Sequence, residues 1–352
     1  MSTMSESVIQ NSPQEVFAVL SQSTSPLCMI DDRLDYDAFC SALAMKYILK
    51  REYGIDLRLT YVSTIPDYFL TILSEFIDPL SIEVGKSPTE IDFSKHDLVL
   101  YLDSAELLKP ARFELYKLPE GMHTVNIDHH VASNSLFAGY NIVRETPATC
   151  ALLYELFAEL DIDIDKTVAA LLLLGLLDDT QLFSISDVRT VDLKIASHLL
   201  GICDCLLFDF VRKLTWNISP EVALIRKIAY KNLVIDIDDR VAYTHISLKD
   251  LNDFHVDPEF QSTVSISDEI KVFDGIDLAF TIKEKSMGEG VYTVSIRSRN
   301  PDYDASEIAS HVGGGGHTMA AGGQMRGVES IETAIENILG LIDKYRKDHN
   351  LV

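Results

Sequence analysis

The chain has 352 residues, of which 47% are hydrophobic and 24% charged, and its formal net charge is -24. This composition is typical of a folded globular protein, and the length suffices for two domains of ordinary size. The negative charge argues against broad binding of duplex nucleic acid, which needs many Lys and Arg side chains to neutralise phosphates. A small anionic substrate stays compatible with it, because a bound divalent cation reverses the local field.

Neither the cysteines nor the apolar segments indicate export or membrane insertion. The five cysteines form no C-x-x-C pair, which argues against a disulfide framework and against a structural zinc site. The N-terminus lacks the basic and apolar regions of a signal peptide, and the longest apolar run, VAALLLLGLL at 168–177, is too short to span a bilayer. We therefore expect a cytoplasmic protein that contacts no membrane.

The N-terminal part of the chain alternates between helix and strand patterns. Helical spacing of apolar residues predicts helices at 14–22, 39–54, 64–76 and 149–160, and throughout 166–205. Short apolar or alternating runs predict strands at 26–30, 57–62, 96–103 and 123–128. Strands that alternate with helices indicate an α/β fold with a mostly parallel sheet covered on both faces.

A different pattern begins near residue 235. Strands with period-two alternation are predicted at 241–248, 277–285 and 292–299, and helices near 249–255, 304–312 and 328–347. The preceding segment 219–233 predicts a helix with Ser219 as N-cap and Pro220 at its first position. We therefore predict a first domain at 14–205, a helical linker at 206–234 and a smaller α/β domain at 235–345.

Acidic residues and histidines follow several of the predicted strands. Asp31, Asp32, Asp35 and Asp37 follow the first strand, Asp103 follows the third, and Asp128-His129-His130 ends the fourth. Ligands of open α/β sheets gather beyond the carboxyl ends of the strands. Carboxylates with imidazoles and without thiolates suit Mn²⁺ or Mg²⁺, with Fe²⁺ as a further candidate, and several acids together suggest two cations sharing a carboxylate.

Two further acids, Asp178 and Asp179, directly follow the apolar run at 168–177 in the same predicted helical segment. Ionised carboxylates in a core are costly unless they are paired or bind a metal. The alternative is a helix end that faces water, and the sequence leaves both readings open.

The string GGGGHTMAAGG at 313–323 is the most specific motif of the second domain. Consecutive glycines let the backbone approach a ligand closely and offer N–H groups to an anion. A flexible linker is the alternative, but linkers do not end in His-Thr-Met-Ala-Ala inside an ordered domain.

The motifs of this chain, and their order, resemble those of the DHH–DHHA1 phosphoesterase family from about residue 14 to 345. They are the D-x-D motif at 35–37, the lone Asp103, the Asp-His-His triplet, G-x-x-x-D-T at 175–180 and the GGGH motif. The branch that the chain resembles most is the nanoRNase/pAp-phosphatase type. Class C inorganic pyrophosphatases share the first domain, but their second domain lacks the GGGH motif. The resemblance implies a parallel-sheet DHH domain, a smaller DHHA1 domain and an active site in the cleft between them.

The resemblance also implies roles for individual residues. The metal ligands would be Asp35, Asp37, Asp103, His129 and Asp179, with Asp103 bridging two Mn²⁺ ions. Asp128 would orient these ligands, and His130 would act with Asp103 and His129 in catalysis. The substrate contacts would be His130, Asn134, Arg297, Ser298, Gly315, Gly316 and His317.

The first motif departs from the family at one position. Asp31 stands where the motif usually begins with His, four residues before Asp35. Asp can ligate Mn²⁺, so Asp31 is kept as a predicted ligand, with Asp32 as the alternative if the loop is shifted. The additional charge should tighten the first cation and weaken its Lewis acidity.

The activity implied by the resemblance is hydrolysis of short nucleotides to nucleoside monophosphates by a hydroxide that two metals activate. The expected substrates are linear dinucleotides such as pGpG and RNA of about two to five nucleotides, with pAp as a sister substrate, and the protein could form a homodimer. Two alternatives remain: a phosphohydrolase of cyclic dinucleotides or longer single strands, and a non-catalytic nucleotide-binding regulator.

Overall fold

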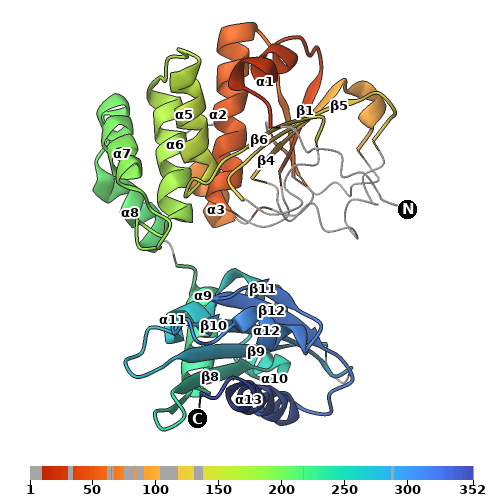
Figure 1. Ribbon diagram of the computed structural model, residues 1–352, viewed down its shortest axis with the longest axis vertical. Coiled ribbons are helices and arrows are strands. Elements are labelled where there is room, and N and C mark those ends of the chain that lie inside the picture. The colour runs from red at the N-terminus through yellow and green to blue at the C-terminus, as the bar shows by residue number, and fades with distance from the viewer. Residues whose placement is uncertain are drawn as a thin grey trace. The chain divides into compact units, whose positions relative to one another are not determined.

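The computed structural model describes residues 10–30, 35–61, 65, 67–74, 82–84, 91–103, 118–130, 138–216, 218–286 and 289–351. The chain divides into two compact units, with the boundary between residues 217 and 218. Each unit has its own hydrophobic core, and each is described by itself (Figure 1). None of the described helices combines the length and the apolar character that crossing a membrane requires.

A six-stranded sheet in the order β3-β2-β1-β4-β5-β6 forms the centre of the N-terminal domain. The strands are β1 (Pro26–Ile30), β2 (Arg58–Tyr61), β3 (Ile82–Val84), β4 (Leu98–Leu102), β5 (His123–Asp128) and β6 (Tyr140–Val143). Every neighbouring pair is parallel, which confirms the predicted sheet. The edge strands β3 and β6 were not predicted, because segments of three or four residues are too short to show a periodic pattern.

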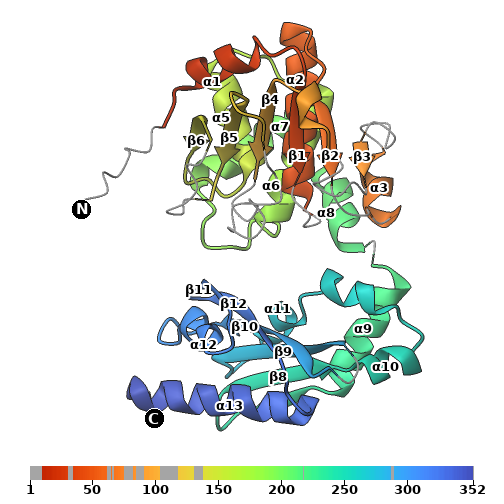
Figure 2. The same cartoon turned by 90° about the vertical axis from the view of Figure 1, so that its right-hand side faces the viewer.

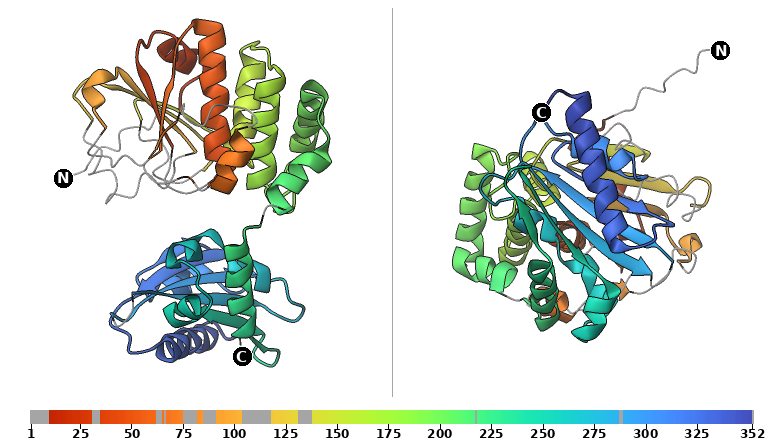
Figure 3. Two further views of the ribbon diagram at one scale, coloured as in Figure 1. Left: turned by 180° about the vertical axis from the view of Figure 1, so that it is seen from behind. Right: turned by 90° about the horizontal axis from the view of Figure 1, so that it is seen from below.

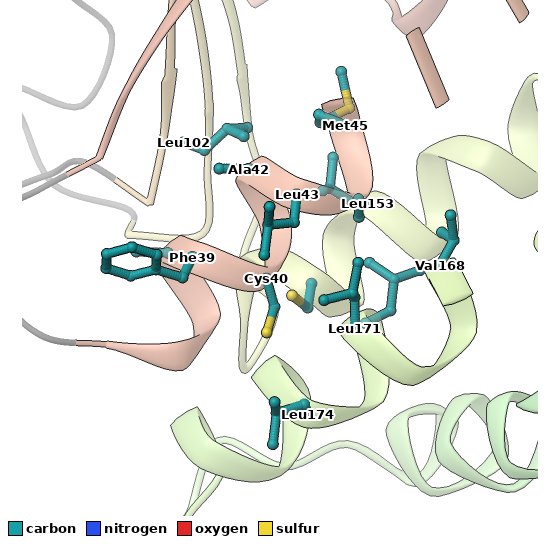
Figure 4. Close-up of a cluster of buried hydrophobic side chains, with 14 of the residues drawn as sticks. Phe39, Cys40, Ala42, Leu43, Met45, Leu102, Leu153, Val168, Leu171 and Leu174 are labelled. Atoms are coloured by element: carbon teal, nitrogen blue, oxygen red, sulfur yellow. The ribbon is translucent and has the colours of Figure 1, made fainter. Parts of the chain in front are cut away.

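Helices lie on one side of this sheet, and the last two of them pack mainly on other helices rather than on the strands. They are α1 (Pro13–Leu20), α2 (Tyr36–Tyr53), α3 (Asp67–Leu73), α5 (Thr149–Glu159), α6 (Lys166–Asp179), α7 (Thr190–Cys203) and α8 (Leu207–Trp216). Helices α2, α5 and α6 lie side by side, and Figure 4 shows Phe39 and Leu43 of α2 in one cluster with Leu153 of α5 and Leu171 of α6. On the other face, a smaller group around Met29 and Tyr101 packs against the 3₁₀ turn η3 (Phe93–Lys95).

A second six-stranded sheet, ordered β11-β12-β10-β9-β8-β7, forms the C-terminal domain (Figure 2). Its strands are β7 (Val234–Asp236), β8 (Val241–Ile246), β9 (Leu278–Ser286), β10 (Val291–Ser298), β11 (Gly315–His317) and β12 (Ala320–Met325). Only β8 and β9 run parallel, so the sheet is mixed. The edge strand β11 was not predicted, since a run of glycines carries no strand signal.

Helices pack on both faces of the second sheet (Figure 3). They are α9 (Pro220–Lys231), α10 (Leu248–Asp253), α11 (Ile266–Ile270), α12 (Ala305–Ser310) and α13 (Ile331–Asp348), with the 3₁₀ turn η4 (Pro258–Thr263). Ser219 caps α9 by accepting from the N–H of Val222, and Pro220 is the first helical residue, as predicted.

The predicted linker 206–234 contains two helices that belong to different domains. Phe210 of α8 lies in the core of the N-terminal domain, whereas Ile225 and Ile228 of α9 lie in a core of the C-terminal domain. Because α8 packs on α6 of the first domain and α9 packs on β8 of the second, the boundary is sharper than the sequence suggested.

Candidate metal centre

The first turn of α2 carries two of the predicted ligands. Asp35 is the N-cap, and its Oδ1 accepts a hydrogen bond from the N–H of Asp37 at 2.7 Å. The fully buried Asp37 carboxylate accepts hydrogen bonds from the backbone N–H groups of Thr149 at 2.6 Å and Cys150 at 2.9 Å. These N–H groups open α5, so the N-terminus of one helix holds the carboxylate of another.

Asp103 follows β4 at the carboxyl edge of the sheet, as predicted. Its φ is 52°, a left-handed conformation that Asp tolerates better than most residues, and its side chain is buried. The Thr149 hydroxyl donates to its Oδ1 at 3.3 Å, and the Nε2 atom of His129 lies 3.2 Å from the same oxygen. The turn therefore aims the Asp103 carboxylate back over the sheet edge toward His129.

The Asp-His-His triplet occupies the end of β5. Asp128 is buried, and its Oδ1 accepts from the backbone N–H of His130 at 3.0 Å and lies 2.8 Å from the Nδ1 atom of that residue. The His129 Nδ1 atom lies 2.9 Å from the carbonyl oxygen of Thr146, which can only accept, so Nδ1 carries the proton and donates. Each imidazole is thus oriented through its Nδ1 atom.

The Nε2 atom of His129 is buried and has no hydrogen-bond partner among the described residues. Because Nδ1 donates to Thr146, Nε2 is the nitrogen that faces Asp103 Oδ1 at 3.2 Å and Asp179 Oδ2 at 3.3 Å. Two carboxylate oxygens this close to one imidazole nitrogen are favourable only with a positive charge between them, either a proton on Nε2 or a cation bound to its lone pair. The donor set of one imidazole and several carboxylates fits Mn²⁺, Mg²⁺ or Fe²⁺.

The acids of this cluster repel one another. Burial and the charge of Asp103 raise the pKa of Asp37 to about 7, and burial and the charge of Asp37 raise that of Asp179 to about 8. Burial lowers the pKa of His129, but the adjacent Asp103 carboxylate and the other surrounding carboxylates outweigh this and raise it to about 10. In the cation-free protein these side chains therefore hold protons, which a bound divalent ion would displace.

Helix α6 delivers Asp179 to this cluster because it packs very closely on α2. A Cβ atom at Gly175 would lie 2.4 Å from the Cys150 Sγ and 2.8 Å from the Asp37 Oδ1. Asp178 and Asp179 are the last two residues of α6. The two acids therefore end the helix, and ligand atoms of Asp179, Asp37 and His129 lie within 4.8 Å of one another, a spacing that could hold a metal ion.

Thr146, Thr149 and Cys150 were not predicted as part of the site. They contribute mainly backbone groups, a carbonyl to His129 and two N–H groups to Asp37. No side-chain motif signals a backbone donor. The predicted residues Asp31 and Asn134, and the alternative ligand Asp32, lie outside the described residues.

The predicted contacts of the C-terminal domain lie on neighbouring strands. Cross-strand pairing aligns Arg297 of β10 with Ala320 of β12, and Ala320 with His317 of β11. Residues paired in this way project from the same face of a sheet. The Arg297 Nε donates to Asp268 Oδ1 at 2.9 Å, and burial of Asp268 is outweighed by this hydrogen bond, so that the pKa of Asp268 falls to about 2.

The remaining predicted contacts differ in accessibility. Gly315, Gly316 and His317 are exposed, and a Cβ at Gly315 would meet nothing within 4 Å. Gly316 has a φ of 147° and its Cβ would lie 2.6 Å from the Ala320 carbonyl oxygen, so a glycine is required there. Ser298 is buried on the opposite face from Arg297, and its hydroxyl donates to the Asn300 carbonyl at 2.6 Å.

Comparison with known proteins identifies both domains. The family model for the DHH family, N-terminal domain, matches residues 27–176, and the DHHA1 domain matches residues 254–344. The first range contains Asp35, Asp37, Asp103 and the triplet, and ends just before Asp178.

Relatives cover most of the chain. A bifunctional oligoribonuclease and PAP phosphatase, NrnA, from Thermus thermophilus is 28% identical over 312 residues, 87% of this chain and 85% of that protein. A probable manganese-dependent inorganic pyrophosphatase from Streptococcus pyogenes is 24% identical over 182 residues, 50% of this chain and 55% of that protein. The crystal structure of an exopolyphosphatase-related protein from Bacteroides fragilis has the same fold, with a TM-score of 0.82, 18% identity and coverage of 99% of this chain and 100% of that one.

Proposed function

Because the chain belongs to the DHH–DHHA1 family of phosphoesterases, we propose that it hydrolyses phosphodiester bonds of short nucleotides with two divalent cations, Mn²⁺ first among them. The observation that carries the proposal is the buried Nε2 atom of His129, which faces carboxylate oxygens of Asp103 and Asp179 at 3.2 and 3.3 Å. Imidazole and carboxylate groups arranged in this way form a ligand set that suits a divalent cation.

The ligands divide into two groups around Asp103. Ligand atoms of Asp37, His129 and Asp179 lie within 4.8 Å of one another, and Asp35, with the predicted ligand Asp31, would hold the second cation together with Asp103. When bound, the two cations would lower the pKa of a shared water and polarise the phosphoryl oxygens. The protein's own contribution is to hold these carboxylates with backbone N–H groups, so that little reorganisation accompanies binding.

His130 is the residue proposed to contact the scissile phosphate. Its Nδ1 is held by Asp128 at 2.8 Å, and the carboxylate of Asp128 together with Asp103 favours the protonated imidazole. Burial lowers the pKa of His130, but the hydrogen bond to Asp128 outweighs it and raises the pKa above its ordinary value. A protonated imidazole can donate to a phosphoryl oxygen or to the leaving oxygen.

Arg297, His317 and the glycines of β11 are proposed to bind a second phosphate or the base of the substrate. The guanidinium and the exposed backbone of Gly315 suit an anion. The relative NrnA, which matches 87% of this chain, is by its name an oligoribonuclease and PAP phosphatase. We therefore expect linear dinucleotides such as pGpG, RNA of about two to five nucleotides and pAp as substrates, and the strongly acidic surface favours short over long strands.

The decisive experiment is product analysis of the purified protein with Mn²⁺ against pGpG, pApA, pAp and longer single strands. We expect nucleoside monophosphates from the dinucleotides and no turnover by Asp103→Asn. Faster cleavage of strands longer than about ten nucleotides would contradict the short-substrate proposal. Nucleotide binding without hydrolysis by the unaltered protein would instead identify a regulator.

A further inference from the structure

Asp178 is the one acid at the end of α6 for which the proposed site has no role. It precedes Asp179, and its Oδ2 accepts a hydrogen bond from the backbone N–H of Tyr36 at 3.1 Å. Tyr36 is the first residue of α2 and directly follows the N-cap Asp35. The Asp178 carboxylate therefore lies against the Asp35–Tyr36 peptide group.

This hydrogen bond does not explain why the residue is an acid. An Asn side chain would accept from the same N–H group, and an ionised carboxylate at the C-terminal end of a helix opposes the helix dipole. Within the described part of the chain, no Lys, Arg or His lies within ion-pair distance of Asp178. Among the described residues its negative charge therefore has no cationic partner, at a helix position that disfavours it.

The two neighbouring acids serve different parts of the first turn of α2. Asp179 lies with Asp37 and His129, and the buried Nε2 atom of His129 points into that group. Asp178 reaches the other part of the turn, where Asp35 caps the helix. One helix end thus presents one carboxylate to each of the two proposed cation positions.

We propose that Asp178 serves the cation held by Asp35, both by fixing the Asp35–Tyr36 turn and by supplying negative charge. This inference rests on the proposed function, because it assumes that two cations bind. Charge supplied from just outside the ligand set strengthens the cation's hold and lowers its Lewis acidity. Asp178 is a positioning residue in this role and does not touch the substrate.

The test compares Mn²⁺ binding to the full chain and to three variants, counted by electron paramagnetic resonance of free Mn²⁺ and by calorimetry. Asp178→Asn keeps the hydrogen-bond acceptor and removes the charge, whereas Asp178→Ala removes both. Asp165→Asn is the matched control, because Asp165 caps the other end of α6 by accepting from the N–H of Val168 at 2.9 Å. Thermal unfolding in a chelator is recorded for all four proteins.

We expect two Mn²⁺ ions for the unaltered protein and for Asp165→Asn. In Asp178→Asn one of the two affinities should fall by about 10- to 100-fold while the other is unchanged, the range found when groups outside the ligand set are lost. Its unfolding temperature in chelator should equal or exceed that of the unaltered protein, because a repelled charge is gone. Asp178→Ala should in addition lose stability in chelator.

Unchanged Mn²⁺ affinities in Asp178→Asn would overturn the inference, as would lower stability of this variant in chelator, since either would leave Asp178 a purely structural acceptor. A single Mn²⁺ ion, or none, in the unaltered protein would refute the proposed two-cation function itself and with it the inference. The inference is therefore tested by the Asp178→Asn variant, and the proposed two-cation function by the unaltered protein.

Discussion

The imidazole of His129 and the carbonyl of Thr146 are joined through Nδ1 at 2.9 Å, and this bond determines which nitrogen faces the acids. The carbonyl has no proton to give, so Nδ1 is the donor and Nε2 is the nitrogen that faces Asp103 and Asp179. A loop residue 17 positions away in the chain thereby fixes the tautomer that cation binding requires.

Replacing His129 tests this relationship most directly. His129→Ala should reduce phosphodiesterase activity by at least about 100-fold and weaken one Mn²⁺ site, because the effect of a ligand exceeds that of the groups that orient it. His123→Ala is the control, since His123 begins the same strand at an exposed position. Steady-state rates on pGpG and Mn²⁺ calorimetry measure both effects, and equal losses in the two variants would rule out a special role for His129.

Asp128→Asn should separate orientation of His130 from cation binding. The substituted amide can still accept one hydrogen bond, but it cannot stabilise a protonated imidazole at 2.8 Å. We expect the turnover rate to fall by about 10- to 100-fold while Mn²⁺ stoichiometry is retained. The pH–rate profile is the sharper measurement, since loss of the carboxylate should lower the apparent pKa assigned to His130; a profile of unchanged shape would argue against this assignment.

Without bound cations, the protein should become less stable as the pH rises. The pKa values of Asp37 and Asp179 are raised to about 7 and 8, and that of His129 to about 10, so the folded chain binds protons that the unfolded chain has released. The stabilising contribution of these groups is complete below their unfolded pKa values and is lost as the pH rises through the folded ones. The unfolding temperature in chelator should therefore fall between about pH 6 and 8.

Saturating Mn²⁺ should reverse this trend. The cation binds the deprotonated ligands, so the increase in unfolding temperature that it causes should be larger at about pH 8 than at about pH 6. Calorimetry in buffers of different ionisation enthalpy should also detect proton release on binding. An Mn²⁺-induced increase that is the same at both pH values would show that these carboxylates are not the ligands.

Much of the site could be predicted because its chemistry is carried by side chains at strand ends. Asp103 and Asp128 follow buried strands, and the parallel order of β1, β4 and β5 brings their carboxyl ends together. The backbone donors of Thr149 and Cys150 could not be predicted, because a bare N–H group has no sequence signature. The split of 206–234 between two cores escaped prediction for a related reason: the helical pattern marks an apolar face but not the surface that buries it.

The close contact of α6 with α2 leads to the last prediction. A Cβ at Gly175 would lie 2.4 Å from the Cys150 Sγ and 2.8 Å from the Asp37 Oδ1, so Gly175→Ala must displace one of them. We expect a loss of about 1–3 kcal/mol in the free energy of unfolding, measured in chelator with urea, together with weaker Mn²⁺ binding as Asp37 moves.

Two companion variants distinguish crowding from an effect of the alanine itself. Gly201→Ala lies inside α7 with no atom within 4 Å of its new Cβ, so it should be neutral or stabilise the protein by up to about 1 kcal/mol. Adding Cys150→Ala to Gly175→Ala removes the sulfur that the methyl group meets first and should recover part of both losses. If the double variant binds Mn²⁺ no better than Gly175→Ala, the contact that matters is the one with Asp37, and the methyl group pushes that ligand directly out of position.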